Sequence, residues 1–245
     1  MIIAVSNQKG GVNKTTITFN LGYLLAEQGK RTLVIDADPQ GSLSTIFNVE
    51  DRETNIYNVL MEQEALQKII VEVEENLHLI PGGIELANFE VNVANKPGRE
   101  NYFKEMLGKI KGQYEYIIID SPPSLGLLLI NILNASQRVI IPTQTDYLSY
   151  KGLDLLLNTV AKVKETFNRE LKIMGVVATG FDSRTLHSKE ILELIEGMNI
   201  LGTITNSVKV KDATLASEPL HRYDKKHKIV AEYRKIAIEV LKDGK

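Results

Sequence analysis

The sequence contains no cysteine and no tryptophan, and only four histidines are scattered along its 245 residues. The absence of cysteine excludes disulfide frameworks, iron–sulfur sites, thiolate zinc sites and cysteine nucleophiles. No apolar run approaches the length that crosses a bilayer. The first residues, MIIAVSNQKGG, lack the basic segment that precedes the apolar stretch of a secretory signal. We therefore expect a cytoplasmic protein.

The sequence also lacks an excess of either charge, because 29 Lys and Arg residues stand against 31 Asp and Glu residues. Binding to nucleic acid must therefore come from a local basic patch rather than from the overall charge. The hydrophobic share of 43% and the charged share of 24% are ordinary for a globular domain, which excludes disordered and collagen-like chains.

Short β-branched runs alternate with longer helical patterns, which is typical of βαβ units around a parallel sheet. We find no internal repeat, linker or shift in composition. The pattern predicts an α/β fold with one doubly wound, mostly parallel sheet and helices on both faces. We expect a single domain over residues 1–245, without an N-terminal helix-turn-helix domain. The predicted strands are 1–6, 32–36, 77–80, 116–120, 138–142, 173–179 and 200–204, and the predicted helices are 15–27, most of 55–75, one ending at 104–111, 152–167, 187–197 and 228–242.

Three of the predicted strands end in carboxylates or in a glycine-rich loop. The first strand runs into residues 7–16, the second ends in Asp36-Ala37-Asp38, and the strand 116–120 ends in Asp120-Ser121-Pro122-Pro123. Ligands of such sheets bind at the carboxyl ends of the strands. We therefore expect these three segments to converge on one crevice.

The glycine-rich loop reads KGGVNKTT and lies between a strand and a helix. Backbone N–H groups of such a turn point at phosphate oxygens, and the helix N-terminus adds partial positive charge. The common pattern G-x-x-x-x-G-K-[ST] is not met, because Gln8 and Asn13 occupy its glycine positions. Lys14 would reach the β- and γ-phosphates, and Thr15 would ligate Mg²⁺. The expected nucleotide-binding residues are Gly10, Gly11, Val12, Asn13, Lys14, Thr15 and Thr16.

With this loop and these strand ends, the sequence resembles the ParA/MinD family, the deviant Walker A branch of P-loop ATPases. The ParA side fits better than the MinD side, and the likeness covers essentially the whole chain. It implies ATP and Mg²⁺ as cofactors and a homodimer in which two subunits sandwich two ATP molecules. The matching stretches are QKGGVNKTT (8–16), DADPQGSLS (36–44), IIIDSPPSLG (117–126) and IIPTQTDYLSYKGL (140–153), with looser matches at FDSRT (181–185) and from residue 208 onward.

The resemblance also suggests roles for individual residues. Lys9 resembles the family's signature lysine, which reaches across the dimer to the partner's phosphates. Asp120 resembles the carboxylate that holds Mg²⁺, and Asp38 the residue that positions the attacking water. Asp36 would support the water shell of the metal, although one of these aspartates could instead cap the turn that follows it. We therefore expect Lys9, Lys14 and Asp38 to be catalytic, and Thr15, Asp120 and Asp36 to serve the metal.

Asn13 stands where the family usually has glycine. Its backbone N–H is retained, and asparagine adopts left-handed φ more readily than most residues. We therefore expect the loop to form and nucleotide to bind. A nucleotide-gated scaffold with negligible turnover remains an alternative.

A basic segment lies in the last third of the chain. Between residues 221 and 235, six Lys and Arg residues stand against two acidic ones. Such clusters suit contact with the phosphate backbone without base reading, although a solvated helix surface has the same composition. The resemblance implies nonspecific DNA binding by the ATP dimer and adenine contacts by residues 208–219. Just before this stretch, Thr205-Asn206-Ser207 replaces the family's Pro-Arg-Asn. The candidate DNA-binding residues are Arg184, Lys209, Lys211, Arg222, Lys225 and Lys226.

The sequence thus predicts a ParA-like ATPase that is associated with the nucleoid. Together with a ParB-like adaptor, it would position a plasmid, a chromosome origin or a protein assembly. One alternative is a MinD-like membrane-associated ATPase, because residues 228–242 have amphipathic spacing. A core-facing helix has the same spacing, so we expect no membrane partner. Another alternative is a metabolic P-loop phosphotransferase.

Overall fold

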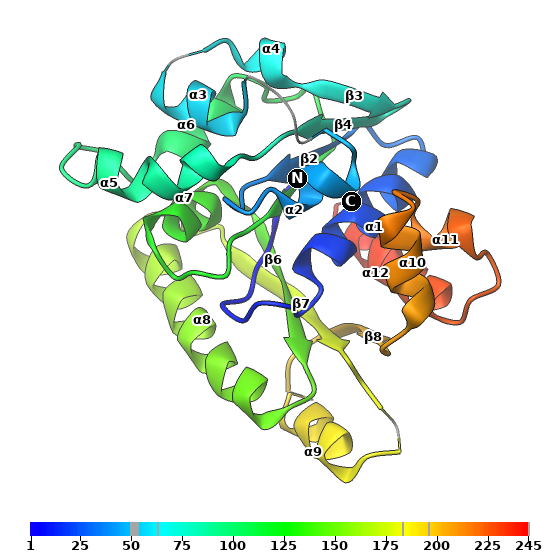
Figure 1. Ribbon diagram of the computed structural model, residues 1–245. Helices are drawn as coiled ribbons and strands as arrows, with labels where there is room; N and C mark the ends of the chain where they lie inside the picture. Colours follow the sequence, from blue (N-terminus) through cyan, green and yellow to red (C-terminus); the bar gives the residue numbers. More distant parts are fainter. Residues whose placement is uncertain (50–53, 63, 183, 196, 245) are drawn as a thin grey trace.

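A computed structural model describes residues 1–49, 54–62, 64–182, 184–195 and 197–244, and its centre is an eight-stranded sheet (Figure 1). The strand order is β3-β4-β2-β5-β1-β6-β7-β8, and every pair is parallel except β3–β4. The predicted mostly parallel α/β sheet is confirmed. The strands are β1 (Ile2–Val5), β2 (Thr32–Asp36), β3 (Val71–Glu74), β4 (Leu77–Ile80), β5 (Tyr116–Asp120), β6 (Arg138–Gln144), β7 (Lys172–Thr179) and β8 (Ile200–Ile204).

Helices cover both faces of this sheet, as the doubly wound pattern predicts (Figure 1). On one face α1 packs against α12, and α12 packs against β8; on the other face α7 packs between α6 and α8. The helical elements are α1 (Lys14–Glu27), α2 (Ser42–Ile46), α3 (Ile56–Met61), α4 (Leu66–Ile69), η1 (Ile84–Asn88), α5 (Phe89–Val93), α6 (Tyr102–Gly108), α7 (Leu127–Ala135), α8 (Tyr147–Thr166), α9 (Leu186–Leu194), α10 (Val208–Leu215), α11 (Leu220–Tyr223) and α12 (Ile229–Asp243).

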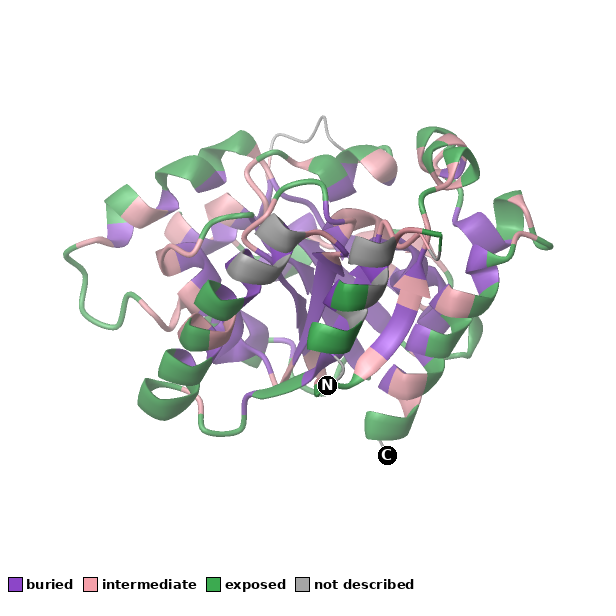
Figure 2. Ribbon diagram, turned by 90° about the horizontal axis from the view of Figure 1, so that it is seen from below, coloured by how far each residue is buried: buried purple, intermediate pink, exposed green. Residues whose placement is uncertain are grey.

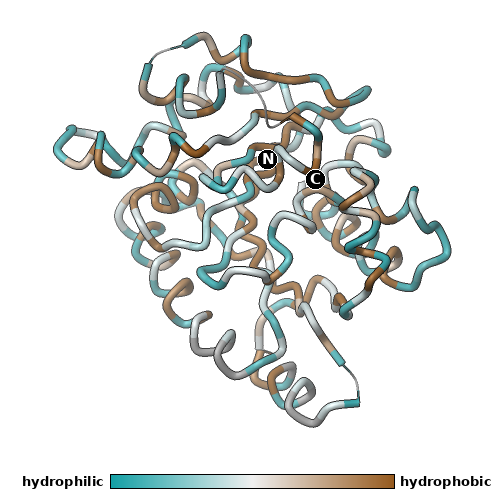
Figure 3. Tube along the Cα trace, in the orientation of Figure 1, coloured by the Kyte–Doolittle hydropathy of each residue, from teal (hydrophilic) through white to brown (hydrophobic). Residues whose placement is uncertain are grey.

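Alternate residues of each central strand supply the two halves of the core. In β1, Ile3 and Val5 face the α1–α12 side, whereas Ala4 faces the α7–α8 side. Because the strands are buried on both faces, they carry continuous apolar runs rather than an apolar–polar alternation. The strands form the buried centre in Figure 2, and Figure 3 shows hydrophobic residues concentrated there while outer loops are hydrophilic.

The prediction of helix for most of residues 55–75 is wrong in its last part. Val71–Glu74 forms β3, an antiparallel edge strand that pairs with β4. Its sequence, VEVE, alternates apolar and charged residues, which suits an edge strand with one face on the protein. Two short helices, α3 and α4, occupy the earlier part of the predicted range.

The helix predicted at residues 152–167 begins earlier than expected, at Tyr147. Asp146 is its N-cap, because one carboxylate oxygen accepts a hydrogen bond from the backbone N–H of Ser149 at 2.9 Å. The sequence analysis also missed α7, whose sequence LLLINILNA is nearly all apolar and shows little helical periodicity. The predicted strands 32–36, 77–80, 116–120 and 200–204 match the observed bounds.

The amphipathic helix at the end of the chain, α12, faces the core. Its apolar residues Ile229, Val230, Tyr233, Ile236, Ala237 and Val240 are all buried. This burial bears out the core-facing interpretation of that stretch and leaves those side chains unavailable to a bilayer surface. Among the residues described, no helix has the length and hydropathy needed to span a membrane.

The α12 residue Tyr233 gives a test of how this core is packed. Its hydroxyl is buried and has no hydrogen-bond partner among the described residues, and burial raises the pKa of this phenol. An unsatisfied buried hydroxyl costs free energy, so Tyr233→Phe should leave the free energy of unfolding unchanged or raise it by about 1 kcal/mol. Urea unfolding followed by circular dichroism measures the change.

Tyr57→Phe is the matched control, because the Tyr57 hydroxyl accepts a hydrogen bond from Asn92 Nδ2 at 2.7 Å on the surface. That substitution should lower the free energy of unfolding by about 0.5 kcal/mol. A loss of more than about 1 kcal/mol in Tyr233→Phe would mean that the hydroxyl is satisfied in solution.

Candidate nucleotide-binding site

The parallel register of β1, β5 and β2 brings the three predicted segments together. Val5 pairs with Asp120, and Asp120 pairs with Asp36, so the carboxyl ends of the three strands lie side by side. The loop 6–13, the segment after β2 and the segment after β5 therefore leave the sheet at one edge. This convergence is the one that the sequence predicts.

The phosphate loop needs left-handed backbone at two positions. Gly11 has φ 72°, and Asn13, the N-cap of α1, has φ 68° and ψ 24°. The expectation that asparagine adopts this conformation in place of glycine is confirmed. The Asn13 carboxamide makes no capping hydrogen bond to α1, so the backbone N–H groups at the start of that helix keep their anion-binding capacity.

Lys14 is held close to this helix start. Its side chain is only 6% exposed, and its ammonium donates to the backbone carbonyl of Lys9 at 3.3 Å. Burial lowers the pKa of Lys14, while Asp120 and Asp38 oppose that shift. Among the described residues it forms no ion pair within 4 Å. A partly desolvated cation without a carboxylate partner is well suited to a phosphate.

Thr15 and Asp120 face each other across the site. The Thr15 hydroxyl donates to Asp120 Oδ2 at 2.7 Å, while the buried Asp120 Oδ1 has no partner among the described residues. Burial and the neighbouring Asp36 carboxylate raise the pKa of Asp120 well above its usual range. A hydroxyl and a carboxylate with a spare oxygen are hard ligands that fit Mg²⁺.

The two residues cannot enclose a metal by themselves. No group of three or more His, Cys, Asp or Glu residues that could hold an ion is found in the described part of the chain. Mg²⁺ in proteins commonly uses one or two carboxylates and completes its shell with phosphate oxygens and water. The donor set therefore fits a metal that arrives with a polyphosphate.

Asp36 lies beside this site, but its oxygens are engaged by the chain. Asp36 Oδ2 accepts hydrogen bonds from the backbone N–H of Ser44 at 2.8 Å and from its hydroxyl at 2.7 Å, and Oδ1 accepts from Asp38 N at 3.3 Å. Burial raises the pKa of Asp36 to about 6, although the bonds from Ser44 oppose the shift. Its role at the metal stays a prediction, and its contacts favour organisation of the loop after β2.

Asp38 is the more accessible of the two carboxylates after β2. It is partly exposed, and its Oδ1 accepts a hydrogen bond from the backbone N–H of Gln40 at 3.0 Å. The following Gly41 has φ 63° and is the N-cap of α2. The segment Pro39-Gln40-Gly41 is a tight turn, closed by a hydrogen bond from Gly41 N to the Asp38 carbonyl at 2.9 Å. It presents Asp38 near Lys14, whose pKa the Asp38 carboxylate raises.

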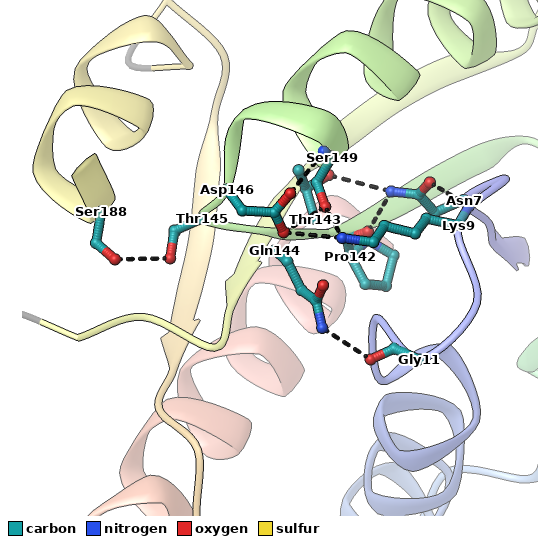
Figure 4. Close-up of polar contacts among 10 residues, drawn as sticks. All are labelled: Asn7, Lys9, Gly11, Pro142, Thr143, Gln144, Thr145, Asp146, Ser149 and Ser188. Atoms are coloured by element: carbon teal, nitrogen blue, oxygen red, sulfur yellow. Dashed lines mark hydrogen bonds and ion pairs between the residues drawn. The ribbon is translucent and has the colours of Figure 1, made fainter.

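The Lys9 side chain reaches to the start of α8, where Figure 4 shows its ammonium beside Asp146 and Ser149. Its ammonium lies 2.9 Å from Asp146 Oδ2 and 2.9 Å from Ser149 Oγ. Sequence reasoning did not single out Asp146 or Ser149, although both lie in a stretch that carries the family resemblance. The side chain of Lys151, a further lysine in α8, lies outside the part of the chain that the structure describes.

A polar cavity opens at the carboxyl ends of β7 and β8. Its volume is about 470 Å³, and its lining includes Thr205 and Asn206, which lie just before α10. None of residues 208–219, the stretch expected to contact adenine, lines it, so the place of the base stays a prediction. The buried Thr205 hydroxyl has no partner among the described residues. Arg184 donates two hydrogen bonds to the Asp182 carboxylate, which offsets part of its charge. The lining residues are Gly180, Phe181, Asp182, Arg184, Thr205, Asn206 and Lys228.

The predicted DNA-binding residues fall into two groups. Arg222 is tied to its own chain: it donates to Glu27 at 2.7 Å and to both oxygens of Glu74 at 2.7 Å, and its guanidinium lies 4.8 Å from the centre of the Tyr23 ring. Its contacts support a structural role that joins α11, α1 and β3, and its contact with DNA stays a prediction. The other five predicted residues are exposed, namely Arg184, Lys209, Lys211, Lys225 and Lys226.

The basic residues around the start of α12 gather on one surface. They line a shallow groove of about 460 Å³ that also contains the half-exposed Ile238. We call this groove the α12 basic patch, and its basic residues are Lys225, Lys226, Lys228, Arg234 and Lys235.

Comparison with known proteins identifies the family. Residues 1–173 match the family model described as "AAA domain". The chain is 40% identical to the sporulation initiation inhibitor protein Soj of Bacillus subtilis, with 99% of each chain covered. It is 37% identical to the chromosome-partitioning ATPase Soj of Treponema pallidum, covering 97% of this chain and 96% of that protein.

Solved structures agree with this assignment. A plasmid partition protein from Borrelia burgdorferi has a TM-score of 0.82 at 29% identity, covering 99% of this chain and 98% of that one. A chain named cobyrinic acid a,c-diamide synthase from Mycobacterium smegmatis, with bound ATP analog and magnesium, has a TM-score of 0.86 at 34% identity, covering 100% and 95%. The chain therefore belongs to the ParA/MinD family of P-loop ATPases, on the side of the ParA and Soj partition proteins.

Proposed function

We propose that this protein binds Mg²⁺ and ATP at the carboxyl edge of the sheet, dimerises in that state and hydrolyses the ATP slowly. One arrangement carries the proposal: Lys14, Thr15, Asp120 and Asp38 surround the N-terminus of α1 with a free cation and a spare carboxylate oxygen. The ATP-bound dimer would bind DNA without sequence preference. With a ParB-like adaptor it would position a plasmid, a chromosome origin or another assembly in the cell.

Each residue of the site has a separate role in the proposed reaction. The N–H groups at the start of α1 and the Lys14 ammonium would bind the β- and γ-phosphates. Thr15 and Asp120 would hold the Mg²⁺, which offsets charge on the phosphates when bound. Asp38 would orient the attacking water, and Lys9 of the partner subunit would add a second cation at the γ-phosphate. Phosphoryl transfer needs positioning and charge stabilisation more than a strong base, so this set suffices.

A metabolic enzyme is the competing function, because chains of similar fold carry the name of a diamide synthase. Measuring phosphate release separates the two. Stimulation by DNA with a ParB-type adaptor supports the partition ATPase, whereas stimulation by a small-molecule acceptor supports a metabolic enzyme. Dimerisation with ATP but negligible phosphate release supports a nucleotide-gated scaffold.

The first prediction concerns Asp38. Asp38→Ala should bind ATP with near-normal affinity yet hydrolyse it about 100-fold more slowly, because the water that attacks the γ-phosphate loses its acceptor. The variant should stay dimeric in ATP. Phosphate release and sedimentation velocity measure the two effects.

Glu115→Ala is the control for Asp38→Ala, since Glu115 pairs with Lys30 at the opposite edge of the sheet. It should leave turnover unchanged. Turnover at the normal rate in Asp38→Ala would remove this carboxylate from the mechanism.

The second prediction concerns the metal. Thr15→Val keeps the shape of the side chain but removes the hydroxyl that faces Asp120. Calorimetry of ATP binding should show that Mg²⁺ strengthens binding at least tenfold in the natural chain and by much less in the variant. Binding without Mg²⁺ should be similar in both. An undiminished Mg²⁺ effect in Thr15→Val would show that the metal lies elsewhere.

The third prediction distinguishes the proposed DNA-binding role of the α12 basic patch from the structural role of Arg222. The double variant Lys225→Ala/Lys226→Ala should weaken DNA binding and reduce the slope of log affinity against log salt by about 4 for the ATP dimer, because two phosphate contacts are lost in each subunit. Arg222→Ala should chiefly lower the melting temperature, because Glu74 loses both hydrogen bonds from Arg222 and Glu27 retains His221 alone among the partners that the structure describes. A fluorescence-anisotropy titration with duplex DNA and ATP, repeated at several salt concentrations, measures the slopes. Equal slopes in the double variant and the natural chain would contradict the assignment of this patch.

A further inference from the structure

Lys9 is held by two side chains that are already joined to each other. Ser149 donates its backbone N–H to Asp146 Oδ1 at 2.9 Å and its hydroxyl to Asp146 Oδ2 at 2.8 Å. The Lys9 ammonium then donates to Asp146 Oδ2 and to Ser149 Oγ, both at 2.9 Å (Figure 4). The acceptor pair is thus fixed by the cap of α8, and Lys9 adds to a preformed arrangement.

Neighbouring contacts dock the whole phosphate loop on the same segment. Asn7 Nδ2 donates to the Pro142 carbonyl at 2.6 Å, and Gln144 Nε2 donates to the Gly11 carbonyl at 3.1 Å (Figure 4). At Gly152, any Cβ would lie 2.6 Å from the side-chain amide nitrogen of Gln8. The segment from β6 into α8 therefore supports the loop from one side over its full length.

We propose that Asp146 and Ser149 are positioning residues that keep Lys9 within its own subunit until ATP-driven dimerisation draws it away. The inference rests on the proposed function, in which Lys9 contacts the triphosphate of the partner subunit. The α8 cap takes two of the three N–H donors of the Lys9 ammonium within its own subunit, whereas a triphosphate of the partner lies across the interface. We infer that the contact with Asp146 breaks once in each subunit when the dimer forms, which frees these donors for the phosphate.

Release of Lys9 from Asp146 is favourable only when a triphosphate offers the ammonium a stronger attraction than the α8 cap does. A triphosphate with its Mg²⁺ offers several charged oxygens, whereas the α8 cap offers one carboxylate and one hydroxyl. Hydrogen bonds from Lys9 and Ser149 hold the pKa of Asp146 below its usual range in spite of partial burial, so the carboxylate stays ionised at neutral pH. Breaking the Lys9–Asp146 contact therefore adds a free-energy cost to dimerisation, and this cost disfavours the dimer when no triphosphate is bound.

The free energy needed to break this contact depends on how far the Lys9 and Asp146 side chains are exposed to solvent. The Lys9 and Asp146 side chains are each 36% exposed, so solvent screens their attraction. Pairs of this kind change an equilibrium by about two- to fivefold, and two of them break per dimer. Removing the contact should therefore tighten the ATP-dependent dimer by about four- to twenty-five-fold.

The first measurement probes the contact in the nucleotide-free monomer. Asp146→Asn removes the charge but keeps the cap, because asparagine caps helices as well as aspartate does. Labelling with an amine-reactive reagent, read by mass spectrometry, should modify Lys9 about two- to fivefold faster in Asp146→Asn than in the natural chain. Glu115→Gln is the matched control: it should speed labelling at Lys30, its partner at 2.8 Å, and leave Lys9 unchanged.

The second measurement follows dimerisation by sedimentation velocity against ATP concentration, without DNA. The ATP concentration at which half of the protein is dimeric should be lower for Asp146→Asn than for the natural chain. The difference between these two ATP concentrations should become smaller as the salt concentration rises, because salt screens the ion pair. Ser149→Ala, which keeps the charge but removes the hydroxyl, should shift in the same direction by less. It also serves as the test if Asp146→Asn does not fold.

The outcomes separate this inference from the function on which it rests. Faster Lys9 labelling together with a lower ATP midpoint supports the inference. Normal ATP-dependent dimerisation with an unchanged midpoint in Asp146→Asn overturns the role of Asp146 alone. A natural chain that stays monomeric at saturating Mg²⁺ and ATP overturns the proposed function, and the inference with it.

Discussion

The site depends on the parallel pairing of β1, β5 and β2, because that pairing alone brings residues far apart in the sequence to one edge. Asp120 has Val5 on one side and Asp36 on the other in the register of the sheet. A slip of the pairing by one residue would turn each of these side chains to the opposite face. The apolar side chains before Asp36 and Asp120 prevent such a slip, since they fill both halves of the core. Packing of the core therefore fixes the geometry of the polar edge.

Burial at this edge has a chemical consequence. Two carboxylates, Asp36 and Asp120, lie in the interior next to each other, and burial raises the pKa of both. The two buried carboxylates differ in their hydrogen bonds. Asp36 accepts hydrogen bonds from Ser44, whereas Asp120 accepts one from Thr15 and has one oxygen without a partner among the described residues. The first arrangement is complete without a ligand, and the second is suited to a cation.

The sequence was sufficient for those features that depend on local pattern. Apolar strand runs, the glycine-rich turn and the carboxylates at strand ends predicted the sheet, the phosphate loop and their meeting point. It failed where the pattern was ambiguous or where tertiary contacts decide. The helix predicted for the charged segment Val71–Glu74 is the strand β3 in the structure, and no local pattern signals that Arg222 pairs with Glu27 and Glu74, more than 140 residues away. The contact of Arg222 with DNA stays a prediction. The sequence does not single out Asp146 and Ser149, because their importance comes from contacts with Lys9, which is distant from them along the chain.

The asparagine in the phosphate loop carries a thermodynamic consequence. A glycine at that position would be free to sample many backbone conformations, whereas asparagine restricts the chain and still accepts the left-handed one that the turn requires. Less backbone entropy then remains to be lost when an anion is captured. Asn13 therefore partly preorganises the loop, which lowers the entropy cost of ordering it around an anion.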